Sequence, residues 1–250
     1  TSVESPTLVT IESPVDLEIG DSSGATVTYP AGEAQGFSLE RGQVLTVATT
    51  AVANADLTGM TISADHEVAV FSGSTCSMIP HGTFACDHLE QQLFPTAVWG
   101  SEYVGAKFSP RGEEPDIWRV LATEDGTSLS TSPALDAVDG AMLDAGEVLQ
   151  FESTSSFELR ASQPISVAQY MVGADYPGPA GGCASDGLFP APASDRSSCA
   201  IETAESCGGH QAIGDPAFLT NVPSSQFRTT YTVLVPGDYL ENYLTFIVPV

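Results

Sequence analysis

Positively charged residues are scarce in this sequence. Lys107 is the only lysine, and lysine and arginine together number 7 among 250 residues, against 32 aspartates and glutamates. The formal net charge is therefore −25. Nucleic acids and anionic membranes both require a basic surface on their partner, so this composition excludes them as ligands. We interpret the acidic side chains as a solvated surface.

Long apolar runs and helical repeats of apolar residues are also missing. No run reaches the roughly 18 apolar residues that a membrane-spanning helix needs, so we predict no membrane span. Apolar residues still make up 42% of the sequence, enough for a packed core. They alternate with polar residues over short runs, which predicts an all-β fold. The predicted strands are 8–11, 25–29, 44–49, 60–63, 67–72, 102–108, 117–122, 127–131, 146–152, 157–161, 165–172, 227–235 and 239–248.

A repeated pattern indicates two similar units. SLERGQVLTV (38–47) resembles MLDAGEVLQF (142–151), and Gly42 and Gly146 occupy the same place in each. A glycine at such a turn adopts a positive φ at little cost. By the same argument, Gly126 predicts a hairpin between its two flanking strands. The repeat predicts two antiparallel β-sandwich units that pack side by side.

These observations divide the chain. We predict a first β-sandwich unit at 1–100 and a second at 101–236. The second unit carries a long loop, 173–217, which is poor in apolar residues and contains three cysteines, so crosslinks are expected to hold it. Residues 237–250 are interpreted as a terminal strand that begins a further unit.

One stretch is typical of a helix start. Asp87 is suited to accept hydrogen bonds from the N–H groups of a first helical turn, and Glu90, three residues later, is placed to reach back. Pro95 ends such a helix, because the residue before a proline is disfavoured in the helical region. We therefore predict one short helix at 87–94, directly after the loop between Cys76 and Cys86.

The five cysteines indicate disulfides rather than a metal site, because no CxxC pair occurs. Cys76 and Cys86 form the first predicted pair, and closing that loop of about 11 residues would stabilise the fold by roughly 2.8 kcal/mol. Cys183 and Cys199 form the second predicted pair. Cys207 is then left to pair outside this sequence. Disulfides favour a secreted or cell-surface location.

The sequence contains no convincing catalytic set. Cys86, Asp87 and His88 are adjacent, with His81 nearby, but neighbouring side chains point in different directions and Cys86 already has a disulfide partner. No GxSxG elbow and no HxxxH spacing are present. We predict that the protein is not an enzyme and has no cofactor, apart from calcium, for which some aspartates in turns are candidates. These are Asp21, Asp125, Asp139 and Asp186.

Seven segments of the chain form a specific pattern when they are taken together in this order. They are VAVFSGS (68–74), CDHLEQQLFP (86–95), WGSEYV (99–104), WRVLATEDGTSL (118–129), LDAGEVLQF (143–151), ISVAQYMVG (165–173) and GDPAFLTNVPSSQFRTTYTVLVP (214–236). Together they resemble the N-terminal domain family of IgGFc-binding proteins, in its bacterial surface or secreted type. The resemblance begins near residue 39 and covers most of the chain after it. It implies a large secreted or surface protein rather than a particular activity or ligand.

The resemblance also implies structural roles for three residues. The positions that match Trp99, Gly100 and Arg119 belong to the fold rather than to a ligand site. Trp99 and Trp118 are expected in the core. Arg119 lies in a predicted strand, where we expect it to form an ion pair with an acidic neighbour or to bind loop carbonyls.

Three functions are compatible with these features. The favoured one is a non-enzymatic extracellular or cell-surface module for adhesion, matrix or structural scaffolding. The second is a subunit of an extracellular filament or sheath, in which the apolar strand Tyr243–Val250 associates with another copy by strand addition. The third is a secreted glycan-binding or glycan-acting protein. The sequence does not identify the protein or glycan ligand.

Overall fold

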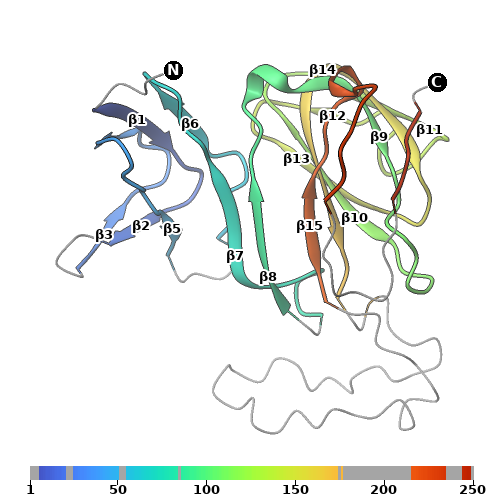
Figure 1. Cartoon of the computed structure of the whole chain (residues 1–250), viewed down its shortest axis with the longest axis horizontal. Helices are drawn as coiled ribbons and strands as arrows, with labels where there is room; N and C mark the ends of the chain where they lie inside the picture. Colours follow the sequence, from blue (N-terminus) through green and yellow to red (C-terminus); the bar gives the residue numbers. More distant parts are fainter. Residues whose placement is uncertain are drawn as a thin grey trace, which may run out of the picture.

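The computed structural model describes residues 6–20, 25–50, 55–83, 86–173, 176, 215–234 and 244–248. Antiparallel strands dominate these ranges, so the predicted all-β class is confirmed. Figure 1 shows the N-terminal strands on one side, a seven-stranded sheet on the other, and a two-stranded hairpin between them. Within the described part of the chain, no helix has the length and apolar character needed to cross a membrane.

The N-terminal strands form two small sheets around one apolar cluster. The sheets have the orders β4-β1-β6 and β3-β2-β5. Side chains of β1 alternate between the two faces, as in any strand, so Val9 and Ile11 are buried while Leu8 is exposed. Leu17 joins them in the cluster. The strands are β1 (Thr7–Glu12), β2 (Leu17–Gly20), β3 (Thr26–Tyr29), β4 (Gln35–Leu39), β5 (Ala48–Thr49) and β6 (Thr61–Ala64).

The seven-stranded sheet is organised around its longest strand, β14. The first part of β14 pairs with β9 and β11, and its second part pairs with β10 and β15. Trp118 of β10 is fully buried and packs edge-to-face on Phe157 of β14, with 4.9 Å between ring centroids. The strands are β9 (Gly100–Gly105), β10 (Asp116–Ala122), β11 (Thr127–Ser132), β12 (Met142–Leu143), β13 (Val148–Ser153), β14 (Phe157–Met171) and β15 (Ala217–Thr220).

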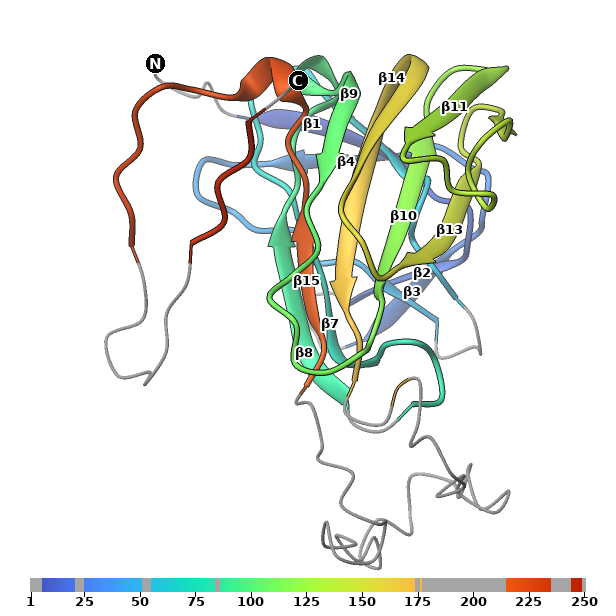
Figure 2. The ribbon, with the colours of Figure 1, turned by 90° about the vertical axis from the view of Figure 1, so that its right-hand side faces the viewer.

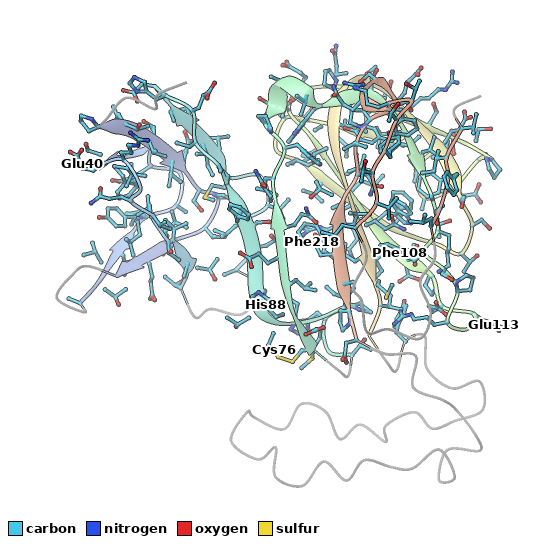
Figure 3. The ribbon with its side chains drawn as sticks, in the orientation of Figure 1. Glu40, Cys76, His88, Phe108, Glu113 and Phe218 are labelled. Atoms are coloured by element: carbon cyan, nitrogen blue, oxygen red, sulfur yellow. A yellow bond between two sulfur atoms is a disulfide. The ribbon has the colours of Figure 1, made fainter. Side chains whose placement is uncertain are left out.

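A crosslinked hairpin stands between these two groups of strands. β7 (Phe71–Met78) pairs with β8 (Cys86–Gln92), and the predicted disulfide between Cys76 and Cys86 is present at its end (Figure 3). Gly73 is required for the close approach of the two strands, since a Cβ at this position would lie 2.3 Å from the main-chain oxygen of Leu89.

The helix predicted at 87–94 is wrong, because these residues form most of strand β8. Asp87 accepts a hydrogen bond from the N–H of His88 at 2.7 Å and caps no helix. Glu90 lies 3.6 Å from the imidazole of His88. Pairing with β7 and burial of Leu89 outweigh the local capping pattern. A 3-10 turn does follow, but it begins after Pro95.

The turn at Gly126 is present, with φ of 68°, but the hairpin predicted around it is wrong. β10 pairs with β13 and β14, whereas β11 pairs with β12 and β14. Ala122, before the turn, pairs with Ile165 of β14, and Leu129, after it, pairs with Ala161 of β14. The chain therefore continues along the same edge of β14 after the turn. The two flanking strands therefore lie one after the other on β14.

Other strand boundaries also differ from the prediction. Segments 157–161 and 165–172 form a single strand, β14. The strand predicted at 67–72 begins only at Phe71, and the one predicted at 44–49 is limited to β5. The described residues 227–234 and 244–248, predicted as strands, are assigned to none. Cys183, Cys199 and Cys207, for which the sequence predicts one disulfide and one thiol left over, lie outside the described residues.

The sequence repeat corresponds to a repeated turn. Gly42 and Gly146 have φ of 80° and 84°. Each turn has four residues, which begin at Glu40 (labelled in Figure 3) and end at Gln43 in the first turn, and begin at Asp144 and end at Glu147 in the second. In both turns, the N–H of the last residue donates to the carbonyl of the first, at 2.9 and 3.0 Å. The side chain of the last residue accepts from the N–H of the first, at 2.7 and 2.8 Å.

Candidate functional site

A pocket of about 260 Å³ lies where two 3-10 turns meet. The turn η1 (Thr96–Val98) joins β8 to β9, and η3 (Ser224–Gln226) follows β15. Both turns lie at the same end of the seven-stranded sheet (Figure 1). Gly100 allows their close approach, because a Cβ there would lie 2.5 Å from the Cβ of Pro223. The lining residues are Phe94, Pro95, Val98, Trp99, Tyr103, Ser166, Asn221, Val222, Pro223 and Gln226.

Hydrogen bonds fix the aromatic residues that line the pocket. The indole N–H of Trp99 donates to the main-chain oxygen of Phe94 at 3.1 Å. The hydroxyl of Tyr103 donates to the carbonyl of Ile165 at 2.5 Å and accepts from the N–H of Gly100 at 3.3 Å. Burial raises the pKa of Tyr103 to about 12, so its phenol remains protonated at neutral pH. The rings are thus held as a rigid wall.

The pocket suits an apolar group. Its lining, as far as the described residues define it, contains no carboxylate, imidazole, thiol or cation. Ser166, Asn221 and Gln226 are the polar, non-aromatic residues among those that line it. The arrangement can bind, but it offers no pair of groups for acid–base or nucleophilic chemistry.

A second cluster of functional groups is ionic and buried. The ammonium of Lys107 lies 2.9 Å from Asp116 and 3.8 Å from Glu114. The other carboxylate oxygen of Asp116 accepts from the N–H of Phe108 and from the amide of Gln169, both at 2.8 Å. Arg111 lies 3.7 Å from Glu114, so the only lysine of the chain and Arg111 together neutralise the two buried acids. This cluster anchors the connection between β9 and β10.

Arg119 connects the second group of strands to the first. Its guanidinium binds Asp56 at 2.7 Å and the hydroxyl of Thr58 at 3.0 Å, in the segment that leads to β6. Burial raises the pKa of Asp56. The hydrogen bonds from Thr58 and Arg119 and the charge of Arg119 together lower it by a larger amount, so the pKa lies below its ordinary value. The pKa of Arg119 is raised, because the contact with Asp56 outweighs burial.

Arg119→Ala is expected to lower the free energy of unfolding by about 1 kcal/mol, since the pair is partly exposed and screened by solvent. The pKa of Asp56 is depressed when folded, so its contribution is present above the ordinary value of 3.8 and is lost as the pH falls through the lower folded value. Urea unfolding of both proteins between pH 7 and 3 should show the difference shrinking at the acidic end. Arg160→Ala, at a more exposed pair, is the control. Equal effects of the two substitutions at pH 7 would contradict the role of Arg119.

The residues considered for chemistry do not meet. Cys86 is oxidised in its disulfide, and the side chain of His88 is exposed on β8. Among the described residues, no group of three or more histidines, cysteines or acids could hold a metal ion. Asp139 instead accepts three hydrogen bonds from its own turn, from Thr131 and Leu135. Asp125 accepts from Ala145. Asp21 and Asp186 lie outside the described ranges.

Sequence reasoning missed half of the pocket. The sequence predicts structural roles for Trp99 and Gly100. Trp99 also lines the pocket with Tyr103, whereas Gly100 lies at the turn against Pro223. Pro223 and Asn221 come from a segment about 120 residues later. A signal was available, because Pro-x-x-x-aromatic occurs at both turns, as PTAVW (95–99) and PSSQF (223–227).

The described part of the chain is thus an all-β structure, with one disulfide-crosslinked hairpin and a largely apolar pocket between two 3-10 turns. The chain belongs to the IgGFc binding protein family, whose family model matches residues 1–249. A curated human protein, the IgGFc-binding protein, is 30% identical to it over 145 residues. That match covers 58% of this chain and 2% of the human protein. No solved structure matches the chain.

Proposed function

We propose that this chain is a non-enzymatic extracellular module that binds a protein, and that the pocket between η1 and η3 receives an apolar side chain of that ligand. The observation that carries the proposal is the composition of the pocket. Its wall consists mainly of apolar and aromatic side chains, and hydrogen bonds hold Trp99 and Tyr103 in place. Such surfaces favour protein contacts, because aromatic anchors supply most of the binding energy.

Three further features support a protein ligand outside the cell. The human relative is named for binding the Fc part of IgG. The disulfide between Cys76 and Cys86 suits an oxidising compartment. The net charge of −25 favours a ligand with a neutral or basic surface, which it attracts at low ionic strength. Adhesion, matrix formation or scaffolding is the role that such a module serves in a larger surface protein.

The human IgG Fc fragment is the probe, and Phe94→Asp is the test variant. Phe94 lines the pocket and is partly exposed, so a carboxylate there places an unpaired charge against the ligand without opening the core. The loss of binding is expected to be tenfold or more, which corresponds to about 1.4 kcal/mol. Surface plasmon resonance with the full chain immobilised measures it.

Met142→Asp is the matched control, since it introduces the same charge at an exposed apolar residue of β12, which is not part of the pocket. Its affinity should equal that of the unchanged chain. Equal losses in both variants would show that charge alone weakens binding and would exclude the pocket. An unchanged chain that fails to bind Fc would exclude this ligand.

A further inference from the structure

The two 3-10 turns that border the pocket have the same internal geometry. Pro95 and Pro223 precede them with φ of −65° and −67°, and ψ of 149° and 156°. Trp99 and Phe227 follow them, and the N–H of each donates to a carbonyl three residues earlier, at 3.1 Å in both turns. Each turn comes directly after the second strand of an antiparallel pair, β7-β8 in one case and β14-β15 in the other.

The likeness continues beyond the turns. The N–H of Gly100 donates to the hydroxyl of Tyr103, and the N–H of Arg228 donates to the hydroxyl of Tyr231, at 3.3 and 2.9 Å. The spacing is constant, because 223 − 95 = 128 for the prolines and 231 − 103 = 128 for the tyrosines. Residues 227–234 are thus the counterpart of 99–106, which contains β9.

In both units of this chain, a first strand pairs with a later strand of the same unit. β1 pairs with β6, and β9 pairs with the first part of β14, each antiparallel. We call β1, β9 and residues 227–234 the three opening segments. Tyr103, in the second opening segment, is 3% exposed, whereas Tyr231, in the third, is 70% exposed. Figure 2 shows the third segment beside the sheets rather than within them.

The same offset extends to the next strand. Phe246 and Val248 lie 128 residues after Trp118 and Val120, since 246 − 118 = 128. Trp118 and Val120 are fully buried in β10, whereas Phe246 and Val248 are 85% and 83% exposed. Phe246 and Val248 thus occupy the places of two core residues of β10, but both are exposed. An apolar stretch exposed in this way is typical of an interaction surface.

We propose that residues 227–248 contain the first two strands of a third unit of the same kind. In that unit, a later strand equivalent to β14 pairs with them, as β14 pairs with β9 and β10. The chain is then built of successive units, each joined to the next by a Pro-x-x-x-aromatic turn. Repeats of this type bury a continuous core only when the neighbouring parts are present. The boundary lies at 226/227, ten residues before the one predicted from the sequence.

One difference sets a limit on the likeness. Arg228 stands at the position of Gly100, where the following turn approaches through Pro223. The guanidinium of Arg228 binds the main-chain oxygens of Phe227 and Ser225, at 2.8 and 3.3 Å. A third turn must therefore pack farther from this one than η3 packs from η1.

The test adds the missing part to the full chain. Residue 250 is the counterpart of residue 122, so residues 123–226 are fused directly after Val250. Hydrogen exchange followed by mass spectrometry then compares 227–248 in the fusion and in the original chain. We expect these amides to exchange on the order of 100-fold more slowly in the fusion, because strands in a formed sheet exchange only after opening. Exchange that stays as fast as in the original chain overturns the proposal.

Phe246→Asp tests whether Phe246 belongs to the core of the proposed third unit or to the core of the first two units. In the original chain this exposed residue should tolerate the change, with an unchanged melting temperature. In the fusion the same change should abolish the added protection, as a charge at Trp118 would in the second unit. A lowered melting temperature of the original chain would show that Phe246 already belongs to its core, and would overturn the proposal without reference to the fusion.

Discussion

Asp116→Asn is expected to lower the free energy of unfolding by about 3–5 kcal/mol, the cost of removing one charge from a buried ion pair. Asp116 is 1% exposed and accepts hydrogen bonds at both carboxylate oxygens. An asparagine keeps the volume but removes the carboxylate nearest to Lys107. Its NH2 group is also a donor, and it would face the donors that now bind the Asp116 carboxylate. Urea unfolding followed by tryptophan fluorescence measures the change, because Trp118 lies on the same strand.

Asp136→Asn serves as the control for this substitution. It removes the same charge from an exposed position, so its effect should stay within about 0.5 kcal/mol. If both variants unfold at the same urea concentration, the ionic cluster contributes nothing particular to stability. A much larger effect at Asp116 would establish that the single lysine of the chain is a structural residue.

Trp118→Ala is expected to have a comparable effect, about 3–5 kcal/mol, because it empties a large space in a core that cannot collapse fully. Its side chain is fully buried and packs on Phe157. The melting temperature should fall by roughly 10 °C for a chain of this size. Phe246→Ala is the matched control. It removes a ring that is 85% exposed and should leave the melting temperature unchanged.

The sequence predicted the elements whose partners are close or whose pattern is strong. Alternation predicted a half-buried strand at 8–11, and β1 covers these residues with alternate burial. The spacing of Cys76 and Cys86 located the disulfide. The helix at 87–94 failed because the capping pattern around Asp87 is local, whereas the pairing of β8 with β7 depends on the whole hairpin. Short-range preference is weak when tertiary pairing competes with it.

The candidate site depended on long-range contacts that no local pattern contains. A side chain at Gly100 would first meet Pro223, which lies 123 residues later in the sequence. The partner of Arg119 is Asp56, 63 residues earlier. An acidic neighbour could be expected for so rare a cation, but 32 acids compete for that place and only the fold selects one. The repeated proline turns were visible in the sequence, and only their hydrogen bonds show that they are equivalent.

The position of Lys107 has a consequence for the durability of the protein. Fluids outside cells contain proteases that cut after lysine or arginine. The side chain of Lys107 is 11% exposed, and those of Arg111 and Arg119 are 19% and 24% exposed. Cleavage at these three positions would first require unfolding of β10 or the segment before it. The scarcity that gives the chain its acidity thus also leaves trypsin-like enzymes few bonds to attack.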